Sequence, residues 1–259
     1  MNRILRALAS HVLPPLVAFA ILIAAWQGYV EWKDVSVLVA PAPDRVAERF
    51  FNDPSFFLKH GGYTLWEATL GLAFGSAIAI VLAVAMAHSR LLERAIFPLA
   101  IAAKVMPLVA IAPVLVIIFG FGQTPKIIVA ALLCFFPMLV SAMAGFRDVD
   151  PRALEFFRSI SASPWHVFWK LRAPSSLPHL FAAVRVSYPL ALIGAVVAEW
   201  FSGTNGLGYV VYSAWLGVRT PELFAAIAVL VVIGVAINVV LTLAERRLLF
   251  WHESVRSTN

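Results

Sequence analysis

Few residues in this chain lie where they could carry out chemistry. The ionisable side chains predicted inside or close to apolar segments are Lys104 and Glu199, with Arg185 near the end of another segment. The sequence contains no Gly-x-x-x-x-Gly-Lys-Ser/Thr run, which would bind nucleotide phosphates. Its six histidines lack metal-ligand spacing, and no Gly-x-Ser-x-Gly motif or paired carboxylates within one apolar segment occur. We therefore predict that the chain is not an enzyme and needs neither cofactor nor metal.

Residues 148–178 form the stretch with the most charged side chains, and this stretch lies between two long apolar segments. Asp150-Pro151 and Ser163-Pro164 each place a capping side chain before a proline, a pattern that begins a helix. We predict two short helices in this stretch. Because it is polar and basic within an otherwise apolar chain, we expect it to present a surface to another molecule.

The elements that must position these residues are membrane helices. Of the 259 residues, 61% are hydrophobic and only 13% are charged, whereas a soluble domain has about 25% charged residues. Six apolar segments are long enough to cross a bilayer as helices, namely residues 12–30, 65–87, 96–119, 127–145, 180–201 and 223–244. We predict an all-α, multi-pass membrane protein with about six transmembrane helices, surrounded by the lipid bilayer.

Basic residues are distributed unevenly between the connections. With the N-terminus placed inside, twelve Lys and Arg residues fall on the inner side and six on the outer side. Because basic residues concentrate in cytoplasmic loops, both termini and residues 148–178 are predicted to be cytoplasmic. The net charge of +6 has the same explanation, and since the basic residues form no single patch we expect no nucleic-acid partner.

Five residues are candidates to line a path across the membrane. Lys104, Pro107 and Pro113 interrupt the third apolar segment, and such breaks are tolerated where protein or water satisfies the freed backbone groups. Lys104 is either functional or extends to the interface. Glu199 is either solvated at the outer mouth or buried and functional, and Asn238 either bonds a neighbouring helix or lines the path.

Three further patterns predict local structure. The turn Pro41–Asp44 followed by residues 45–51 predicts a short amphipathic helix along the membrane surface. Gly71 and Gly75 have a spacing that lets another helix approach closely. Residues 202–209 contain three glycines and predict a folded connection.

The polar stretch resembles the EAA loop of the permease subunits of type I bacterial ATP-binding-cassette (ABC) importers. Glu155 stands at the position of the family's glutamate and Ser161 at that of its glycine. Pro174 and Pro178 match the proline-rich end of the loop, and residues 159–165 are similar to the family's Ser-Leu-Gly-Ala-Ser-x-Trp.

Two other stretches are similar to the nitrate, sulfonate and taurine permeases. They are residues 105–113 followed by 119–122, and residues 198–201 followed by 206–209. The resemblance identifies residues 63–247 as the core transmembrane domain. Residues 1–62 would then be an N-terminal transmembrane helix with a periplasmic loop, and residues 248–259 a cytoplasmic tail.

The resemblance implies the permease subunit of an ATP-driven importer in a bacterial inner membrane. Its partners would be a cytoplasmic ABC ATPase dimer, a periplasmic substrate-binding protein and a second copy of the permease. The substrate would be a small solute of the sulfonate, nitrate or taurine type, or a vitamin precursor such as hydroxymethylpyrimidine or riboflavin. The implied ATPase-coupling residues are Glu155, Arg158, Ser159, Ser161, Ala162 and Ser163.

The loop departs from the family pattern at two places, and two alternatives to the importer stay open. Ser161 must adopt a dihedral that a side chain accepts or must carry strain. Phe156 and Phe157 replace alanines and enlarge the apolar face of the first loop helix. The alternatives are a stand-alone secondary transporter, disfavoured by the scarcity of ionisable residues in the spans, and a non-transporting scaffold, disfavoured by the proline-broken third segment.

Overall fold

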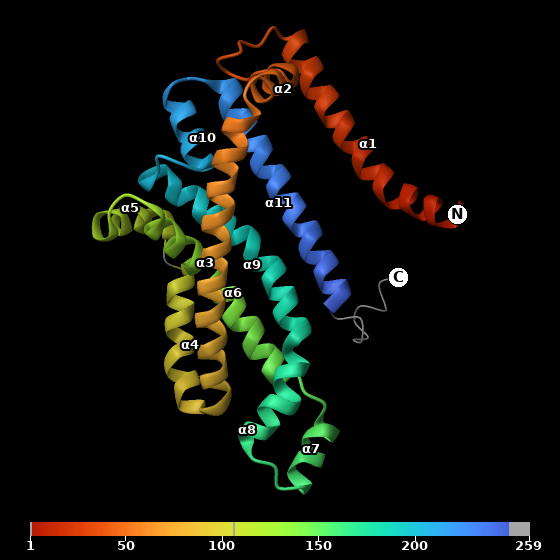
Figure 1. The fold of residues 1–259 in the computed structure, drawn as a ribbon, viewed down its shortest axis with the longest axis vertical. Coiled ribbons are helices and arrows are strands. Elements are labelled where there is room, and N and C mark those ends of the chain that lie inside the picture. The colour runs from red at the N-terminus through yellow and green to blue at the C-terminus, as the bar shows by residue number, and fades with distance from the viewer. Residues whose placement is uncertain (1, 106, 249–259) are drawn as a thin grey trace. The chain divides into compact units, whose positions relative to one another are not determined.

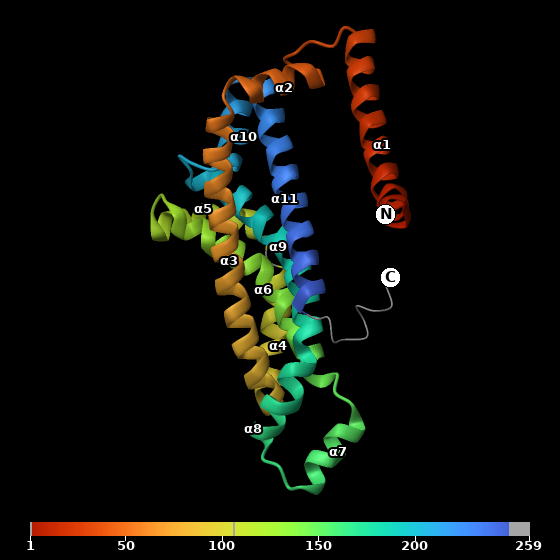
Figure 2. The same ribbon diagram turned by 45° about the vertical axis from the view of Figure 1, so that its right-hand side comes forward.

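The computed structural model describes the backbone of residues 2–105 and 107–248, and the side chains of residues 13–102, 107 and 109–248. Every secondary-structure element within these ranges is a helix, as Figure 1 and Figure 2 show from two directions. In chain order they are α1 (Asn2–Trp32), α2 (Pro43–Asn52), α3 (Pro54–His88), α4 (Arg90–Val105), α5 (Leu108–Phe119), α6 (Gln123–Arg147), α7 (Pro151–Ser159), α8 (Pro164–Val167), the π-helical turn η1 (Phe168–Arg172), α9 (Ala173–Ser202), α10 (Leu207–Leu216) and α11 (Thr220–Leu248).

The predicted all-α membrane fold is confirmed, with one difference in how the spans are built. Among the described residues, five helices are long and apolar enough to cross a membrane, and they lie in α1, α3, α6, the continuous run α8–η1–α9, and α11. The predicted span 96–119 instead consists of α4 and α5, which are 16 and 12 residues long. Pro107 is the N-cap of α5, so the proline noted in the sequence stands where the second of these helices begins.

The chain divides into two compact units. Unit 1 comprises Met1–Leu58 with Val210–Val229, and unit 2 comprises Lys59–Tyr209 with Leu230–Asn259. These units are defined by which residues pack together. The regions predicted from the sequence, residues 1–62, 63–247 and 248–259, are defined by function instead, and their boundaries stay a prediction. Residues 249–259 of the predicted tail lie outside the described residues.

Unit 1 contains the predicted amphipathic helix as α2. Its valine, Val46, is buried, whereas Arg45 and Glu48 are exposed and form an ion pair of 3.2 Å. On another side of α2, Arg49 pairs at 2.7 Å with Glu222 of α11, which also pairs with Arg219. The position of α2 along a membrane surface stays a prediction.

Unit 2 is built on the close packing of α6 and α9, which run along each other (Figure 1). Small side chains allow this approach, because Ala130 of α6 and Ala191 and Ala195 of α9 are fully buried. Helix α3 joins them at the predicted glycine pair. A Cβ atom at Gly71 would lie 2.4 Å from the Ala130 Cβ, and one at Gly75 would lie 2.5 Å from a backbone oxygen of α6. The close helix approach predicted from these two glycines is confirmed.

The helical run that contains α9 is the longest in the described chain. From Pro164 to Ser202 the chain stays helical for 39 residues, with η1 inserted between α8 and α9. At 1.5 Å per residue such a run extends about 58 Å. It begins in the polar stretch around α7 and α8 and ends next to the glycine-rich connection to α10.

Candidate functional site

The two short helices predicted in the polar stretch are present, and each begins at the predicted cap. The Asp150 side chain accepts a hydrogen bond from the Arg152 N–H at 2.9 Å, with Pro151 in the first turn of α7. The Ser163 hydroxyl accepts one from the His166 N–H at 3.3 Å at the start of α8. We call residues 150–167, which comprise α7, α8 and their connection, the coupling knob, after the role that the sequence predicts for them.

The connection between the two knob helices contains a strained serine. Ser161 has a φ of +52°, in the left-handed region that glycine occupies freely. Its N–H bonds the Arg158 carbonyl at 2.9 Å, and the next N–H, of Ala162, bonds the Phe157 carbonyl at 3.0 Å, so the turn is closed by two hydrogen bonds. Of the two possibilities left open by the sequence, the structure therefore has the strained one, at a cost of about 1–2 kcal/mol.

The knob exposes most of the residues predicted to couple to an ATPase. Glu155, Arg158, Ser159, Ser161 and Ser163 are exposed, and Ala162 is half-buried. Neither the Glu155 carboxylate nor the Arg158 guanidinium forms an ion pair within the described part of the chain, so both charges face outward.

The two phenylalanines in place of alanines have different surroundings. Phe156 is 61% exposed and adds an apolar surface beside the free charges. Phe157 is half-buried, and its ring lies 6.1 Å from that of His166, which ties α7 to α8. Only one of the two rings therefore enlarges the exposed face of the knob.

An aromatic cluster fixes the base of the knob to the helix bundle. Phe168 of η1 is buried, and its ring centroid lies 5.2 Å from Phe146 of α6 and 5.1 Å from His88 at the end of α3. Trp165 of α8 stacks on the same ring at 5.9 Å. The base of the knob is therefore packed against α3 and α6 through the rings of α8 and η1.

The candidate path residues do not gather at one place. Lys104 belongs to α4, but its side chain lies outside the described residues. Pro107 is exposed at the start of α5, and Pro113 lies half-buried within that helix. Asn238 of α11 lines a crevice of about 330 Å³ with Arg185 and other residues of α9. Of the four candidates whose side chains the structure describes, only Glu199 belongs to a buried polar cluster.

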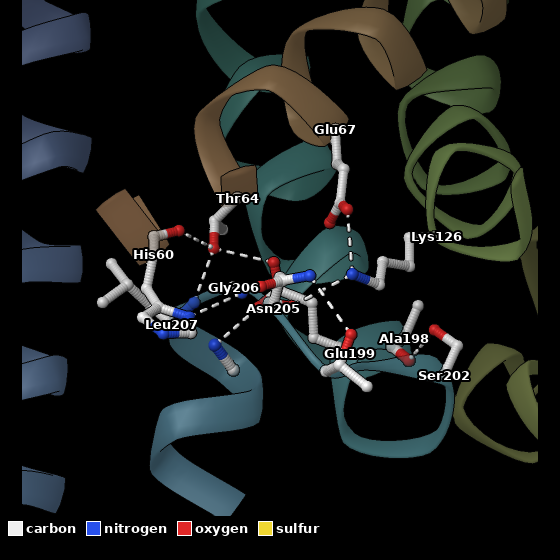
Figure 3. A network of polar contacts seen from close by, with 12 residues as sticks. His60, Thr64, Glu67, Lys126, Ala198, Glu199, Ser202, Asn205, Gly206 and Leu207 are labelled. Atoms are coloured by element: carbon white, nitrogen blue, oxygen red, sulfur yellow. Dashed lines mark hydrogen bonds and ion pairs between the residues drawn. The ribbon is translucent and has the colours of Figure 1, made fainter. Parts of the chain in front are cut away.

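Glu199 lies in the last turn of α9 and is fully buried, which excludes the solvated interpretation, whereas its function stays a prediction. Its carboxylate accepts a hydrogen bond from the Thr64 hydroxyl at 2.7 Å and another from the Gly208 N–H at 2.5 Å (Figure 3). These hydrogen bonds take the place of water around the buried carboxyl group. Glu199 is therefore part of the internal structure and not a solvated residue at a mouth.

A buried ion pair lies beside Glu199. The Lys126 ammonium of α6 is 2.9 Å from a Glu67 carboxylate oxygen of α3, and both side chains are almost completely buried. Lys126 also donates a hydrogen bond to the Asn205 carbonyl at 3.0 Å. His60 of α3 completes the group, because its Nδ1 accepts a hydrogen bond from the Gly206 N–H at 3.0 Å.

These side chains hold four successive backbone residues. Lys126 binds the carbonyl of Asn205, His60 binds the N–H of Gly206, and Glu199 binds that of Gly208. Between them, the Leu207 N–H donates to the Thr64 hydroxyl at 2.8 Å. We call the five side chains that form this arrangement the loop clamp: His60, Thr64, Glu67, Lys126 and Glu199.

Two glycines make room for the loop clamp. Gly206 has a φ of +108°, and a Cβ atom there would lie 2.0 Å from a Glu199 carboxylate oxygen. A Cβ atom at Gly208 would lie 2.3 Å from the Val196 carbonyl oxygen. The folded connection predicted from the three glycines is present, and Gly206 and Gly208 permit the backbone to lie directly against the buried Glu199 side chain.

Sequence reasoning missed most of the loop clamp. The statement that Lys104, Glu199 and Arg185 are the ionisable residues in or near the spans is wrong, because Glu67 lies inside a predicted span and Lys126 is buried in α6. The signal was present on α3. Residues 60, 64 and 67 are spaced by four and three positions, which places three polar side chains on one face of an apolar helix.

Comparison with known proteins gives a consistent result. Residues 71–249 match the family described as "Binding-protein-dependent transport system inner membrane component". The chain is 35% identical to the riboflavin transport system permease protein RibX of Chloroflexus aurantiacus, over 92% of this chain and 90% of that protein. It is 28% identical to the taurine transport system permease protein TauC of Escherichia coli, over 96% and 93% respectively.

Solved structures show the same fold. A chain of the MetNI methionine ABC transporter in an inward-facing conformation aligns with a TM-score of 0.63 at 18% sequence identity. The alignment covers 78% of this chain and 96% of the MetNI chain.

Proposed function

The chain belongs to the family of binding-protein-dependent transport system inner membrane components, and we propose that its coupling knob transmits the work of a cytoplasmic ABC ATPase to the membrane helices. Members of this family are permease subunits of ABC importers, which carry substrate across the inner membrane and work with an ATPase and a substrate-binding protein. The predicted family and fold are therefore confirmed, and the chain has no nucleotide-binding Gly-x-x-x-x-Gly-Lys-Ser/Thr run of its own.

One observation carries the proposal about coupling. The coupling knob exposes a carboxylate at Glu155, a guanidinium at Arg158 and a phenyl ring at Phe156, and its base is fixed by the aromatic cluster around Phe168. An exposed surface with both charges free and a rigid connection to the bundle is suited to docking in a groove on a partner. Glu155 would pair with a basic residue of the ATPase, and Arg158 with an acidic one.

Other parts of the proposal concern the arrangement in the membrane. The knob and both termini would be cytoplasmic, as the distribution of basic residues predicts. Two copies of the chain would form the permease, each with one knob on one of two ATPase subunits. Residues 63–247 would form the core transport domain, and the substrate-binding protein would deliver substrate from the periplasmic side.

The substrate is proposed to be a small polar solute. Relatives named for riboflavin and for taurine transport support this size class. This class includes sulfonates and nitrate, and also vitamin precursors such as hydroxymethylpyrimidine or riboflavin.

The family assignment is the evidence against a stand-alone secondary transporter. The scarcity of ionisable residues within the spans no longer supports it, because Glu67, Lys126 and Glu199 are buried together. A scaffold without transport activity is disfavoured by the same family assignment.

A charge reversal on the knob tests the coupling proposal. We expect Glu155→Lys to abolish co-purification of the ATPase and ATP-driven uptake, while the amount of protein in the membrane stays unchanged. Glu48→Lys is the matched control, because Glu48 is an exposed carboxylate on α2 whose pair with Arg45 is solvated and contributes little. ATPase assembly and uptake at the level of the Glu48→Lys control would contradict the docking role.

A further inference from the structure

The loop clamp and the coupling knob lie at the two ends of the same helical run. The run begins at Pro164 in the knob, and Glu199 lies in its last turn. Glu199 is therefore separated from the start of α8 by about 50 Å of continuous helix. A displacement or rotation of the knob would reach the loop clamp through the backbone of α9.

The loop clamp also ties together three helices, α3, α6 and α9. His60, Thr64 and Glu67 come from α3, Lys126 from α6 and Glu199 from α9 (Figure 3). All of them contact either the backbone of residues 205–208 or another member of the clamp. Moving one of the three helices away would leave a buried carboxylate, ammonium or backbone group without its partner.

We propose that Glu199 and Thr64 are positioning residues that hold residues 205–208 as a closed outer gate, which is released when the transport path opens outward. The proposal rests on the importer function and orientation above, which place the loop clamp on the periplasmic side. In this structure all four backbone groups are bound. Because they are consecutive, they would be released together rather than singly.

The first test measures how accessible the gate residues are to a thiol reagent, in the permease without its ATPase. Leu207 at the start of α10 is completely buried and Thr204 in the connection before it is exposed, whereas the natural thiol, Cys134, is buried. In a Cys134→Ala background, Leu207→Cys should react slowly with a membrane-impermeant maleimide and Thr204→Cys quickly.

Weakening the clamp should expose the buried position. We expect Glu199→Gln and Thr64→Val each to raise the labelling rate of Leu207→Cys at least tenfold, a change that corresponds to about 1.4 kcal/mol. Thr64→Ser keeps the hydroxyl and should restore slow labelling, which separates loss of the hydrogen bonds from general unfolding. The Thr204→Cys rate should stay constant in all variants. Equal labelling of Leu207→Cys with and without the clamp substitutions would overturn the proposal.

The second test measures ATP hydrolysis by the assembled transporter. In the complex with its ATPase, Thr64→Val should raise ATP hydrolysis in the absence of binding protein by several-fold, and Thr64→Ser should return it to the wild-type rate. Faster labelling without any change in hydrolysis would show that the loop clamp is structural only, and would overturn its role as a gate. Labelling is measured without the ATPase, so a failure of complex assembly would contradict the proposed function and leave the labelling result valid.

Discussion

Removal of the Lys126 ammonium is the most direct way to test whether the buried ion pair holds the permease together. In Lys126→Met the Glu67 carboxylate loses a partner at 2.9 Å, and the Asn205 carbonyl loses its donor at 3.0 Å. Breaking a buried pair by removing one partner costs about 3–5 kcal/mol, and an unpaired buried carbonyl accounts for about 1–3 kcal/mol of such a loss. We expect the midpoint of thermal unfolding in detergent, followed by tryptophan fluorescence, to fall by on the order of 10 °C.

A second substitution separates the lost charge from the lost hydrogen bond. Adding Glu67→Gln to Lys126→Met removes the unpaired carboxylate but not the unpaired Asn205 carbonyl, so we expect it to recover about half of the loss. Lys59→Met is the matched control, because Lys59 is an exposed lysine on the same helix as Glu67, and its loss should change stability by less than about 0.5 kcal/mol. A Lys126→Met protein as stable as Lys59→Met, or a double variant no better than the single one, would refute the reasoning.

Two other predictions concern backbone positions. Ser161→Gly should relieve about 1 kcal/mol of left-handed strain in the coupling knob and keep ATPase assembly and uptake, whereas Ser161→Val should weaken assembly; equal assembly by both variants would show that the strain is not significant. Gly71→Ala places a Cβ atom 2.4 Å from the Ala130 Cβ and should lower thermal stability by about 1–3 kcal/mol. Gly62→Ala, where a Cβ atom meets nothing within 4 Å, should leave stability unchanged or raise it, and a loss equal to that of Gly71→Ala would contradict the packing explanation.

Local patterns were sufficient to predict five of the six spans and the two knob helices, whereas the predicted span 96–119 is divided into α4 and α5. Apolar segments of about 20 residues predict membrane helices because the bilayer requires that length. The Asp150-Pro151 and Ser163-Pro164 pairs predicted helix starts because a cap and a first-turn proline are short-range features. The ends of the helices were less predictable: α3 begins at Pro54, well before the apolar segment, since polar residues extend a helix beyond the hydrophobic core.

The loop clamp could not be predicted in the same way because its contacts are distant in sequence. Thr64 and Glu199 are 135 positions apart, and Glu67 and Lys126 are 59 apart. A lone buried carboxylate would be unfavourable, so Glu199 by itself suggested a solvated residue. Its burial becomes favourable only when α3 supplies a hydroxyl and the first turn of α10 supplies an N–H group. The spacing of His60, Thr64 and Glu67 indicated a polar face on α3, but not which helix would meet it.

We propose that this permease moves substrate only when an ATPase drives it. The direct measurement is uptake into proteoliposomes that contain the chain with its co-purified ATPase, supplied with the binding protein and the solute that calorimetry shows the binding protein to hold. We predict uptake that requires ATP, the ATPase and the binding protein together, and that is lost in Glu155→Lys but not in Glu48→Lys. Uptake that persists without ATP or without the ATPase would contradict the account.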